Sequence, residues 1–320
     1  MPLKIKAFIA TMFDFDDGNG QGASEFRHWQ KRYWQGVTPI AVRGAPFPVY
    51  VNRDGVGGAV LGIGKVRSSA SMLAILLDPR FDFSEAYFMI SGAAGAPPSQ
   101  ATIGSVIWGT WLVDADLGHR WAPDESASDE MPFLPCQGFG TTAALPLNPA
   151  LVARAMALSA DSLASLSLQR SDAVEAYCAR YPQTIARGAP FVGSGTHVAS
   201  DCFFHGAGLS AQVQAITRLY GADDYVISEM EGIAIAQVIQ PLHGLERVMS
   251  LRVVANFDQP PPGETTVQHL ATALAHTTDG LADSIDHLEK VGGRVIDAMV
   301  DDWASWRGGV SECVAWVSEA

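Results

Sequence analysis

Two glutamates flank a methionine at the start of an Ala-rich apolar stretch, in the run Glu229-Met230-Glu231. The residues before this run are typical of a strand and those after it of a helix, so the carboxylates would lie at a sheet edge. One acidic residue is enough to stabilise a first helical turn through the helix dipole. A carboxylate fixed there can also accept hydrogen bonds from two neighbouring sugar hydroxyls, while the thioether packs against sugar carbons. We therefore favour contact with a sugar over helix capping alone.

A second segment, Met89–Ala96, is an apolar strand that ends in small residues. Gly92, Ala93 and Gly95 would let a ligand approach the backbone, whose N–H groups can bind anions or hydroxyls. A tight turn after the strand is the alternative explanation.

A third segment, Leu251–Asp258, is an apolar strand that acquires polar side chains at its end. In open α/β sheets, ligands bind outside the carboxyl ends of the strands. Asn256 and Asp258 are therefore placed to reach a ligand, with turn formation before Pro260 as the alternative.

Two glycine-rich runs match nucleotide-binding fingerprints only in part. Gly62–Lys65 is not a P-loop, because Ala59 and Val66 stand where that motif needs glycine and a hydroxyl residue. Gly55–Gly58 is not a dinucleotide fingerprint, because Val60 holds the position of its third glycine. The eight histidines and four cysteines are dispersed, and we expect neither a metal site nor a disulfide framework.

Charge and hydropathy exclude several classes of protein. A net charge of −13 argues against nucleic acid and against anionic membrane surfaces. The longest apolar runs, Ala86–Gly95 and Val248–Ala255, are far shorter than the roughly 20 residues of a spanning helix. We find no signal peptide pattern and expect a cytoplasmic protein.

Short β-branched runs alternate with helical periodicity, which predicts an α/β fold with a central, mixed, mostly parallel sheet flanked by helices. We expect one domain over residues 1–320, without repeats or linkers. The predicted strands are Ile5–Ala10, Gly58–Ile63, Ala86–Ser91, Ser105–Val113, Val198–Phe203 and Met249–Ala255. The predicted helices are Ser68–Leu77, Pro149–Ala160, Ala211–Tyr220, Glu231–Ile239 and Thr266–Val300, and the predicted loops are Asp14–Ser24, Ala122–Pro135 and Gln259–Gly263.

The ordered combination of these segments resembles the nucleoside phosphorylase and nucleosidase superfamily, and within it the purine nucleoside permease branch. The resemblance covers roughly residues 5–270. It rests on the three segments above and on Thr11-Met12-Phe13, Glu25-Phe26 with Trp29, Asp78–Asp82, Ile103–Ser105 with Trp108, Val113–Leu117 with His119, and Asn256 with Pro260–Gly263.

The resemblance implies a role for each matched position. Met230 and Glu231 would bind the ribose hydroxyls, with Glu229 beside them. Phe203 would stack on the base, in the run that also holds Asp201. Gly92 and Ala93, with Gly95, would lie beside the ribose and the nucleophile, and Glu25 would orient that nucleophile.

Two departures from the superfamily pattern affect the chemistry. Asn256 stands where the nucleosidases carry an aspartate that protonates the leaving purine, and an amide cannot be a general acid. Its hydrogen bonds suit a 6-oxopurine, and Asp258 is a second candidate for the proton. Ile90-Ser91 lacks the phosphate-binding arginine of bacterial phosphorylases, so phosphate would need Lys65, Arg67 or a neighbouring subunit.

We therefore expect cleavage of the N-glycosidic bond of a purine nucleoside, by hydrolysis or by phosphorolysis. No cofactor is expected, although phosphate is a possible co-substrate, and the resemblance implies a homo-oligomer. Two alternatives stay open: a nucleoside-binding protein without catalysis, and a biosynthetic enzyme acting on an unusual nucleoside or nucleotide.

Overall fold

A central sheet organises the chain in the computed structural model, which describes residues 1–15, 22–125, 132–134, 140–163 and 170–310. Within these residues the sheet has nine strands. The strands are β2 (Ala7–Thr11), β3 (Tyr50–Val51), β4 (Val56–Val60), β6 (Tyr87–Ala96), β7 (Val106–Asp114), β10 (Ala144–Pro146), β11 (Val192–Ala199), β12 (Tyr225–Glu229) and β13 (Val248–Phe257).

The sheet is mixed, with a majority of parallel pairings, as the sequence predicted. The order runs β10-β7-β11-β12-β6-β2-β4-β3, and β13 pairs with both β6 and β7. The pairs β2 with β4, β2 with β6, β6 with β13, β7 with β11, and β11 with β12 are parallel. Because β13 bridges β6 and β7, five of the strands close into a barrel-like ring.

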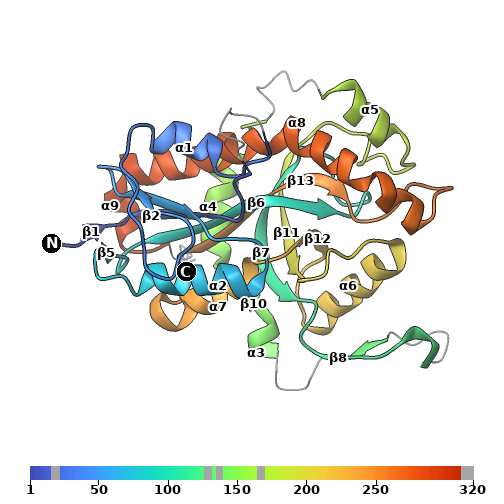
Figure 1. The fold of residues 1–320 in the computed structure, drawn as a ribbon, viewed down its shortest axis with the longest axis horizontal. Coiled ribbons are helices and arrows are strands. Elements are labelled where there is room, and N and C mark those ends of the chain that lie inside the picture. Colours follow the sequence, from blue (N-terminus) through green and yellow to red (C-terminus); the bar gives the residue numbers. More distant parts are fainter. Residues whose placement is uncertain (16–21, 126–131, 135–139, 164–169, 311–320) are drawn as a thin grey trace, which may run out of the picture.

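Helices cover both faces of the sheet (Figure 1). On one face lie α1 (Arg27–Tyr33) and the long α8 (Thr266–Asp301), and on the other α2 (Lys65–Leu76) and α7 (Gly232–His243). The remaining helices are α3 (Gly140–Ala143), α4 (Pro149–Ser159), α5 (Asp172–Ala179), α6 (Ala207–Leu219), α9 (Trp303–Arg307) and the 3₁₀ turn η1 (Pro123–Glu125). Two peripheral ribbons pair β1 (Leu3–Lys4) with β5 (Phe81–Asp82), and β8 (His119–Arg120) with β9 (Phe133–Leu134).

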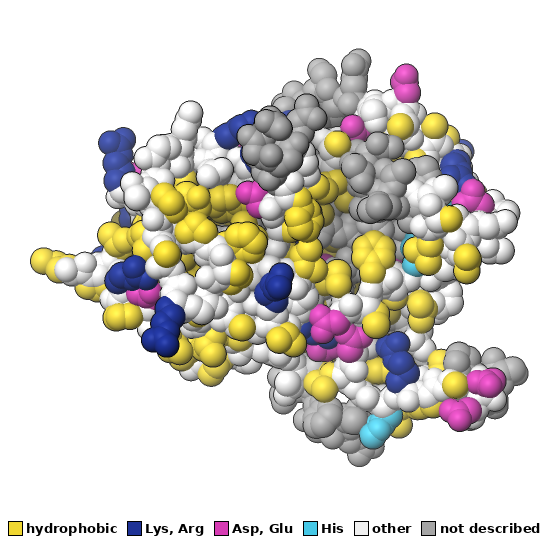
Figure 2. All heavy atoms as spheres, viewed as in Figure 1, with side chains coloured by type: hydrophobic (Ala, Val, Ile, Leu, Met, Phe, Trp, Pro, Cys, Tyr) yellow, Lys and Arg dark blue, Asp and Glu magenta, His cyan; other side chains and the backbone are white. Residues whose placement is uncertain are grey.

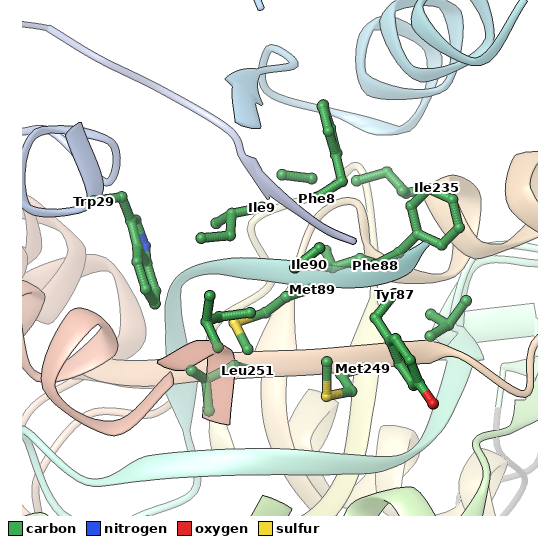
Figure 3. Close-up of a cluster of buried hydrophobic side chains, with 14 of the residues drawn as sticks. Phe8, Ile9, Trp29, Tyr87, Phe88, Met89, Ile90, Ile235, Met249 and Leu251 are labelled. Carbon is green, nitrogen blue, oxygen red and sulfur yellow. The ribbon is translucent and has the colours of Figure 1, made fainter. Parts of the chain in front are cut away.

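The core lies where β6 and β13 run side by side (Figure 3). Met89 and Leu251 from these strands pack toward Trp29 of α1, and all three side chains are buried. Apolar side chains also gather on the surface between α1 and α2 in Figure 2.

All five predicted helices begin and end within four residues of observed ones. Asn148 caps α4 as expected, accepting hydrogen bonds from the backbone N–H groups of Ala150 and Leu151. The short helices α1 and α5 were not predicted. The predicted loops Asp14–Ser24 and Ala122–Pro135 lie partly outside the described residues.

Two strand predictions were wrong. The predicted strand Val198–Phe203 is β11, which begins at Val192 and ends at Ala199, so Phe203 lies in the following loop. The glycines in Val192–Thr196 have low strand propensity, but pairing with β7 on one side and β12 on the other overrides it. The predicted strand Ala86–Ser91 ends too early, because β6 continues to Ala96, paired with β13 along its length and with β12 at Gly95.

Candidate functional site

A cavity opens at the ends of β6, β12 and β13, where the three predicted segments meet. Apolar side chains form much of its wall: Met12, Phe13, Ile63, Phe203, Phe204 and Leu281. Its polar lining comes from Glu25, Ser228, Glu229, Glu231 and Asn256, with Met230 between the last two glutamates. A predominantly apolar cavity with a few convergent polar groups is typical of a small-molecule site.

Two β-bulges aim the polar side chains. In β13, Val254 pairs with Ala94 whereas Asn256 pairs with Gly95, so one extra residue is inserted between them. In β12, Tyr225 and Ile227 pair with consecutive residues of β11, so Val226 is the extra residue, and Ser228 then pairs with Gly95 from the other side. A bulge re-aims the side chains that follow it, and Gly95 leaves them room. A Cβ on Gly95 would lie 2.6 Å from Oγ of Ser228 and 3.1 Å from Nδ2 of Asn256.

Arg252 is buried below the cavity among three glutamates. Its guanidinium forms ion pairs with Glu229 and, at 3.5 Å, with Glu231. Gly92 gives the group room, because a Cβ there would lie 2.6 Å from Nη1 of Arg252 and 2.6 Å from Oε1 of Glu25. One cation therefore faces several carboxylates in a region that excludes bulk water.

The sequence offered two roles for the glutamates around Met230, helix capping and contact with a sugar, and in the structure each glutamate takes one of them. Glu229 caps α7, accepting hydrogen bonds from the backbone N–H groups of Glu231 (2.8 Å) and Gly232 (2.7 Å). Its remaining contact is with Arg252. Glu231 makes no capping bond and instead accepts one from the backbone N–H of Gly64 at 2.9 Å. Glu231 is thus the carboxylate that faces the cavity, and Glu229 supports it.

Glu25 reaches the cavity from the other side. The backbone N–H groups of Met12 and Ala93 each donate to it at 2.7 Å, one to each carboxylate oxygen. Burial raises the pKa of Glu25 to about 7, against the opposing effect of Arg252. Burial likewise raises the pKa of Glu231 to about 7. Both carboxyls therefore titrate close to neutral pH.

The structure brings most of the predicted site residues together. Glu25, Ala93, Gly95, Phe203, Glu229, Met230, Glu231 and Asn256 line the cavity. Gly92 lies just behind this lining. Phe203 remains 56% exposed at the cavity's edge.

Besides Gly92, three predicted site residues lie outside the lining. The ammonium group of Lys65 pairs with Asp114 (2.6 Å) and Asp116 (2.9 Å). Asp201 accepts a hydrogen bond from the backbone N–H of Lys65 at 2.8 Å and borders a separate surface groove with Arg67. Asp258 is buried and directs its carboxyl away from the cavity.

Sequence reasoning assigned no role to Arg252, although a signal was present. A single arginine stands in an otherwise apolar strand, and buried arginines are rare unless they are paired. The contributions of Phe13, Phe204 and Leu281 carried no such signal, because isolated apolar residues are ordinary in any sequence.

The sequence is similar to that of purine nucleoside permeases. The profile of the purine nucleoside permease family matches residues 4–311. A purine nucleoside permease of Candida albicans is 26% identical over 93% of this chain and 75% of the relative's length. A probable purine nucleoside permease of Schizosaccharomyces pombe is 25% identical over 77% of this chain and 76% of its own.

Solved structures of nucleosidases share the fold. The 5′-methylthioadenosine/S-adenosylhomocysteine nucleosidase of Neisseria meningitidis, in complex with methylthio-immucillin-A, superposes with a TM-score of 0.58 and 18% identity, covering 92% of this chain and 99% of that one. Futalosine hydrolase of Helicobacter pylori gives a TM-score of 0.61 and 15% identity, covering 92% and 98%. In the part of the chain that the structure describes, no helix has the length and apolar character needed to cross a bilayer. The extent of the profile match shows that the chain belongs to the purine nucleoside permease family.

Proposed function

We propose that this protein cleaves the N-glycosidic bond of a purine nucleoside, with water as the nucleophile. One observation carries the proposal: Glu25 and Glu231, from distant parts of the chain, face one apolar cavity that also holds Asn256 and Phe203. The shared fold with nucleosidases is consistent with this chemistry.

Each end of the substrate has a complementary part of the cavity. Glu231 accepts hydrogen bonds from the ribose hydroxyls, and Met230 packs against the sugar carbons. Phe203 and Asn256 contact the base. The water lies near Glu25 and Ala93, and the Glu25 carboxylate takes a proton as the oxygen attacks C1′ of the oxocarbenium-like transition state.

The distribution of charge favours water over phosphate. Among the described residues, the cavity lining contains no lysine or arginine. Lys65 is neutralised by two aspartates, and Arg252 is surrounded by carboxylates. A phosphate dianion would have to approach Glu25 and Glu231 without a free cation to offset the repulsion.

The amide of Asn256 supports a 6-oxopurine as the base. One hydrogen of its Nδ2 is donated to the backbone carbonyl of Phe257 at 3.1 Å. The remaining N–H of the amide can donate to the 6-oxo oxygen, and Oδ1 can accept from N7–H once the leaving base is protonated there.

The decisive experiment incubates the purified protein with inosine, guanosine, adenosine and uridine, with and without phosphate, followed by chromatography. Free hypoxanthine or guanine without phosphate supports the proposal. Strict dependence on phosphate would replace hydrolysis by phosphorolysis, and cleavage of adenosine alone would contradict the base preference.

A nucleoside-binding protein without catalysis is the second candidate, and Asn256 is the observation that favours it. Without an acid at this position the leaving base has no direct proton donor. Tight binding of inosine in calorimetry, with no release of base over hours, would support this candidate. Self-association, which the family resemblance implies, stays a prediction for light scattering to test.

A further inference from the structure

Asp258 has its carboxyl buried behind the cavity wall and lies two residues beyond Asn256. We propose that Asp258 is the proton reservoir for the departing base, connected to the cavity through the hydroxyl groups of Tyr225 and Ser228. This inference rests on the proposed function. It supplies the acid that Asn256 cannot provide.

A row of hydroxyl groups leads from Asp258 to the cavity. The hydroxyl oxygen of Tyr225 lies 2.9 Å from Oδ2 of Asp258, so Tyr225 donates to the carboxylate, or the protonated acid donates to Tyr225. Ser228 lies on the same face of β12 as Tyr225, and its hydrogen bonding to Tyr225 lowers the pKa of that tyrosine against the larger effect of burial. Ser228 itself lines the cavity.

The bulge in β12 makes this path possible. Residues three apart in a regular strand point to opposite faces of the sheet. Thr196 pairs with Tyr225 and Val198 pairs with Ser228, so one extra residue lies between the two pairs on β12. Tyr225 and Ser228 therefore point to the same face of the sheet. Without the bulge they would point to opposite faces.

The path ends at the base. Ser228 and Asn256 flank Gly95 from the strands on either side, and both would contact a Cβ placed on that glycine. The Ser228 hydroxyl is therefore next to the amide that contacts the purine in the proposed function.

The surroundings of Asp258 favour its protonated form. Burial raises the pKa of Asp258 to about 6, although hydrogen bonds from Ser210 and Tyr225 oppose the shift. Tyr225 is fully buried and its pKa is raised well above the usual value, so it cannot hold a charge and serves to pass a proton on. Burial thus brings the titration of Asp258 to within about one pH unit of neutrality, so that its protonated form is accessible there.

The transfer balances in atoms and charge. The C1′–N9 bond breaks and its electron pair moves into the purine, which takes a proton at its imidazole nitrogen from Ser228. Ser228 is reprotonated by Tyr225, and Tyr225 by the Asp258 acid, which becomes a carboxylate. Water adds to C1′ and gives its proton to the Glu25 carboxylate, and both carboxyls return to their starting forms by exchange with solvent after the products leave.

Two variants test the path, Asp258→Asn and Tyr225→Phe, each nearly isosteric with the native residue. Two kinds of substrate are compared: inosine, and a riboside whose leaving group needs no proton, either p-nitrophenyl β-D-riboside or 7-methylguanosine. Both variants should lower kcat on inosine by about 10²-fold, the usual contribution of general acid catalysis, with KM nearly unchanged. Cleavage of the second kind of substrate should stay close to that of the wild type.

Tyr181→Phe is the matched control, because Tyr181 is as buried as Tyr225 but its hydroxyl contacts Tyr177 and the backbone carbonyl of Gln259 and does not line the cavity. It should leave both kinds of cleavage near the wild-type rate. The inference fails if Asp258→Asn and Tyr225→Phe leave kcat on inosine unchanged, or if they lower kcat equally on both kinds of substrate. Either result would leave the proposed function standing. A wild-type protein that cleaves no nucleoside overturns the proposed function, and the inference with it.

Discussion

The backbone N–H of Gly64 donates a 2.9 Å hydrogen bond to Oε1 of Glu231, 167 positions further along the chain. This bond joins the loop before α2 to the residue that precedes α7. Gly64 adopts φ of +87°, a conformation that favours glycine, and its neighbour Lys65 is held by Asp201. The Gly62–Lys65 run, which fails as a P-loop, therefore orients the carboxylate proposed to bind ribose.

The first prediction concerns this loop. Gly64 combines its positive φ with ψ of 155°, a region almost reserved for glycine, so alanine there would be strained by roughly 1–3 kcal/mol. Its Cβ would lie 3.3 Å from Oδ1 of Asp201. Displacing the amide from Glu231 should raise KM for the nucleoside by about tenfold, equivalent to about 1.4 kcal/mol. Steady-state kinetics of Gly64→Ala would measure this.

Gly36→Ala is the control for backbone strain. Gly36 has φ of +76°, and a Cβ added there would have no neighbouring atom within 4 Å, so it shares the strain without touching the cavity. It should lower the melting temperature as Gly64→Ala does and leave KM unchanged. A similar rise of KM in both variants would contradict the assigned role of the Gly64 amide.

The second prediction concerns Glu231→Gln. The amide oxygen can still accept a hydrogen bond from Gly64, but the variant loses the charge that faces Arg252 and one acceptor for the diol. We expect kcat/KM to fall by at least about 10²-fold, since losing one partner of a buried charged pair costs about 2–5 kcal/mol. Glu175→Gln, at a side chain that is 60% exposed, should leave kcat/KM unaltered. Retention of more than half the wild-type kcat/KM by Glu231→Gln would exclude the ribose-binding role.

The sequence predicted part of the fold and part of the candidate site. The sequence predicted the helices flanking a mixed, mostly parallel sheet, because periodicity is a local property of the chain. It also predicted that Glu25, Met230, Glu231 and Asn256 belong to one site, although this prediction depended on the resemblance to a known superfamily. Local reasoning did not extend β6 to Ala96, because the partners that bury those glycines lie on distant strands.

The partners of charged residues could not be read from the sequence. Lys65 looked available for phosphate, but its ammonium is held by Asp114 and Asp116, some fifty positions away. The resemblance assigned Glu231 to the ribose and left Glu229 beside it, and only their three-dimensional partners show which carboxylate caps the helix. Bulges such as the one in β12 also leave no reliable mark in composition, yet they decide which side chains meet.

The third prediction is the pH dependence of catalysis. Burial raises the pKa of both Glu25 and Glu231 to about 7, and both act as carboxylates in the proposed function. Protonation below that pH removes the base and the sugar acceptor, so kcat/KM should fall on the acid side of about pH 7, and loss of the proton of Asp258, whose pKa is raised to about 6, should lower it again on the alkaline side. The acid limb should be the steeper one because two groups titrate there and one group on the other limb, and kcat/KM reports the free enzyme. Initial rates between pH 5 and 9 would test this, and a flat profile from pH 5 to 7 would contradict it.

The fourth prediction concerns Arg252→Met, which leaves Glu25, Glu229 and Glu231 without their shared cation. Breaking a buried ion pair on one side costs about 3–5 kcal/mol, so the free energy of unfolding at pH 8 should fall by about that amount. Removing the cation also raises the pKa of Glu25 and of Glu231 further above their unfolded values, because Arg252 lowers both. A raised pKa in the folded state means that stability is greatest at low pH and declines as pH rises. The loss should therefore be smaller at pH 5.5 than at pH 8, as urea titrations at the two pH values would show.

The control variant is Arg218→Met, which removes a 70% exposed arginine 3.7 Å from Asp224. It should leave the free energy of unfolding nearly unchanged at both pH values. An equal loss for Arg252→Met at the two pH values would mean that its aliphatic packing, rather than its charge, stabilises the site.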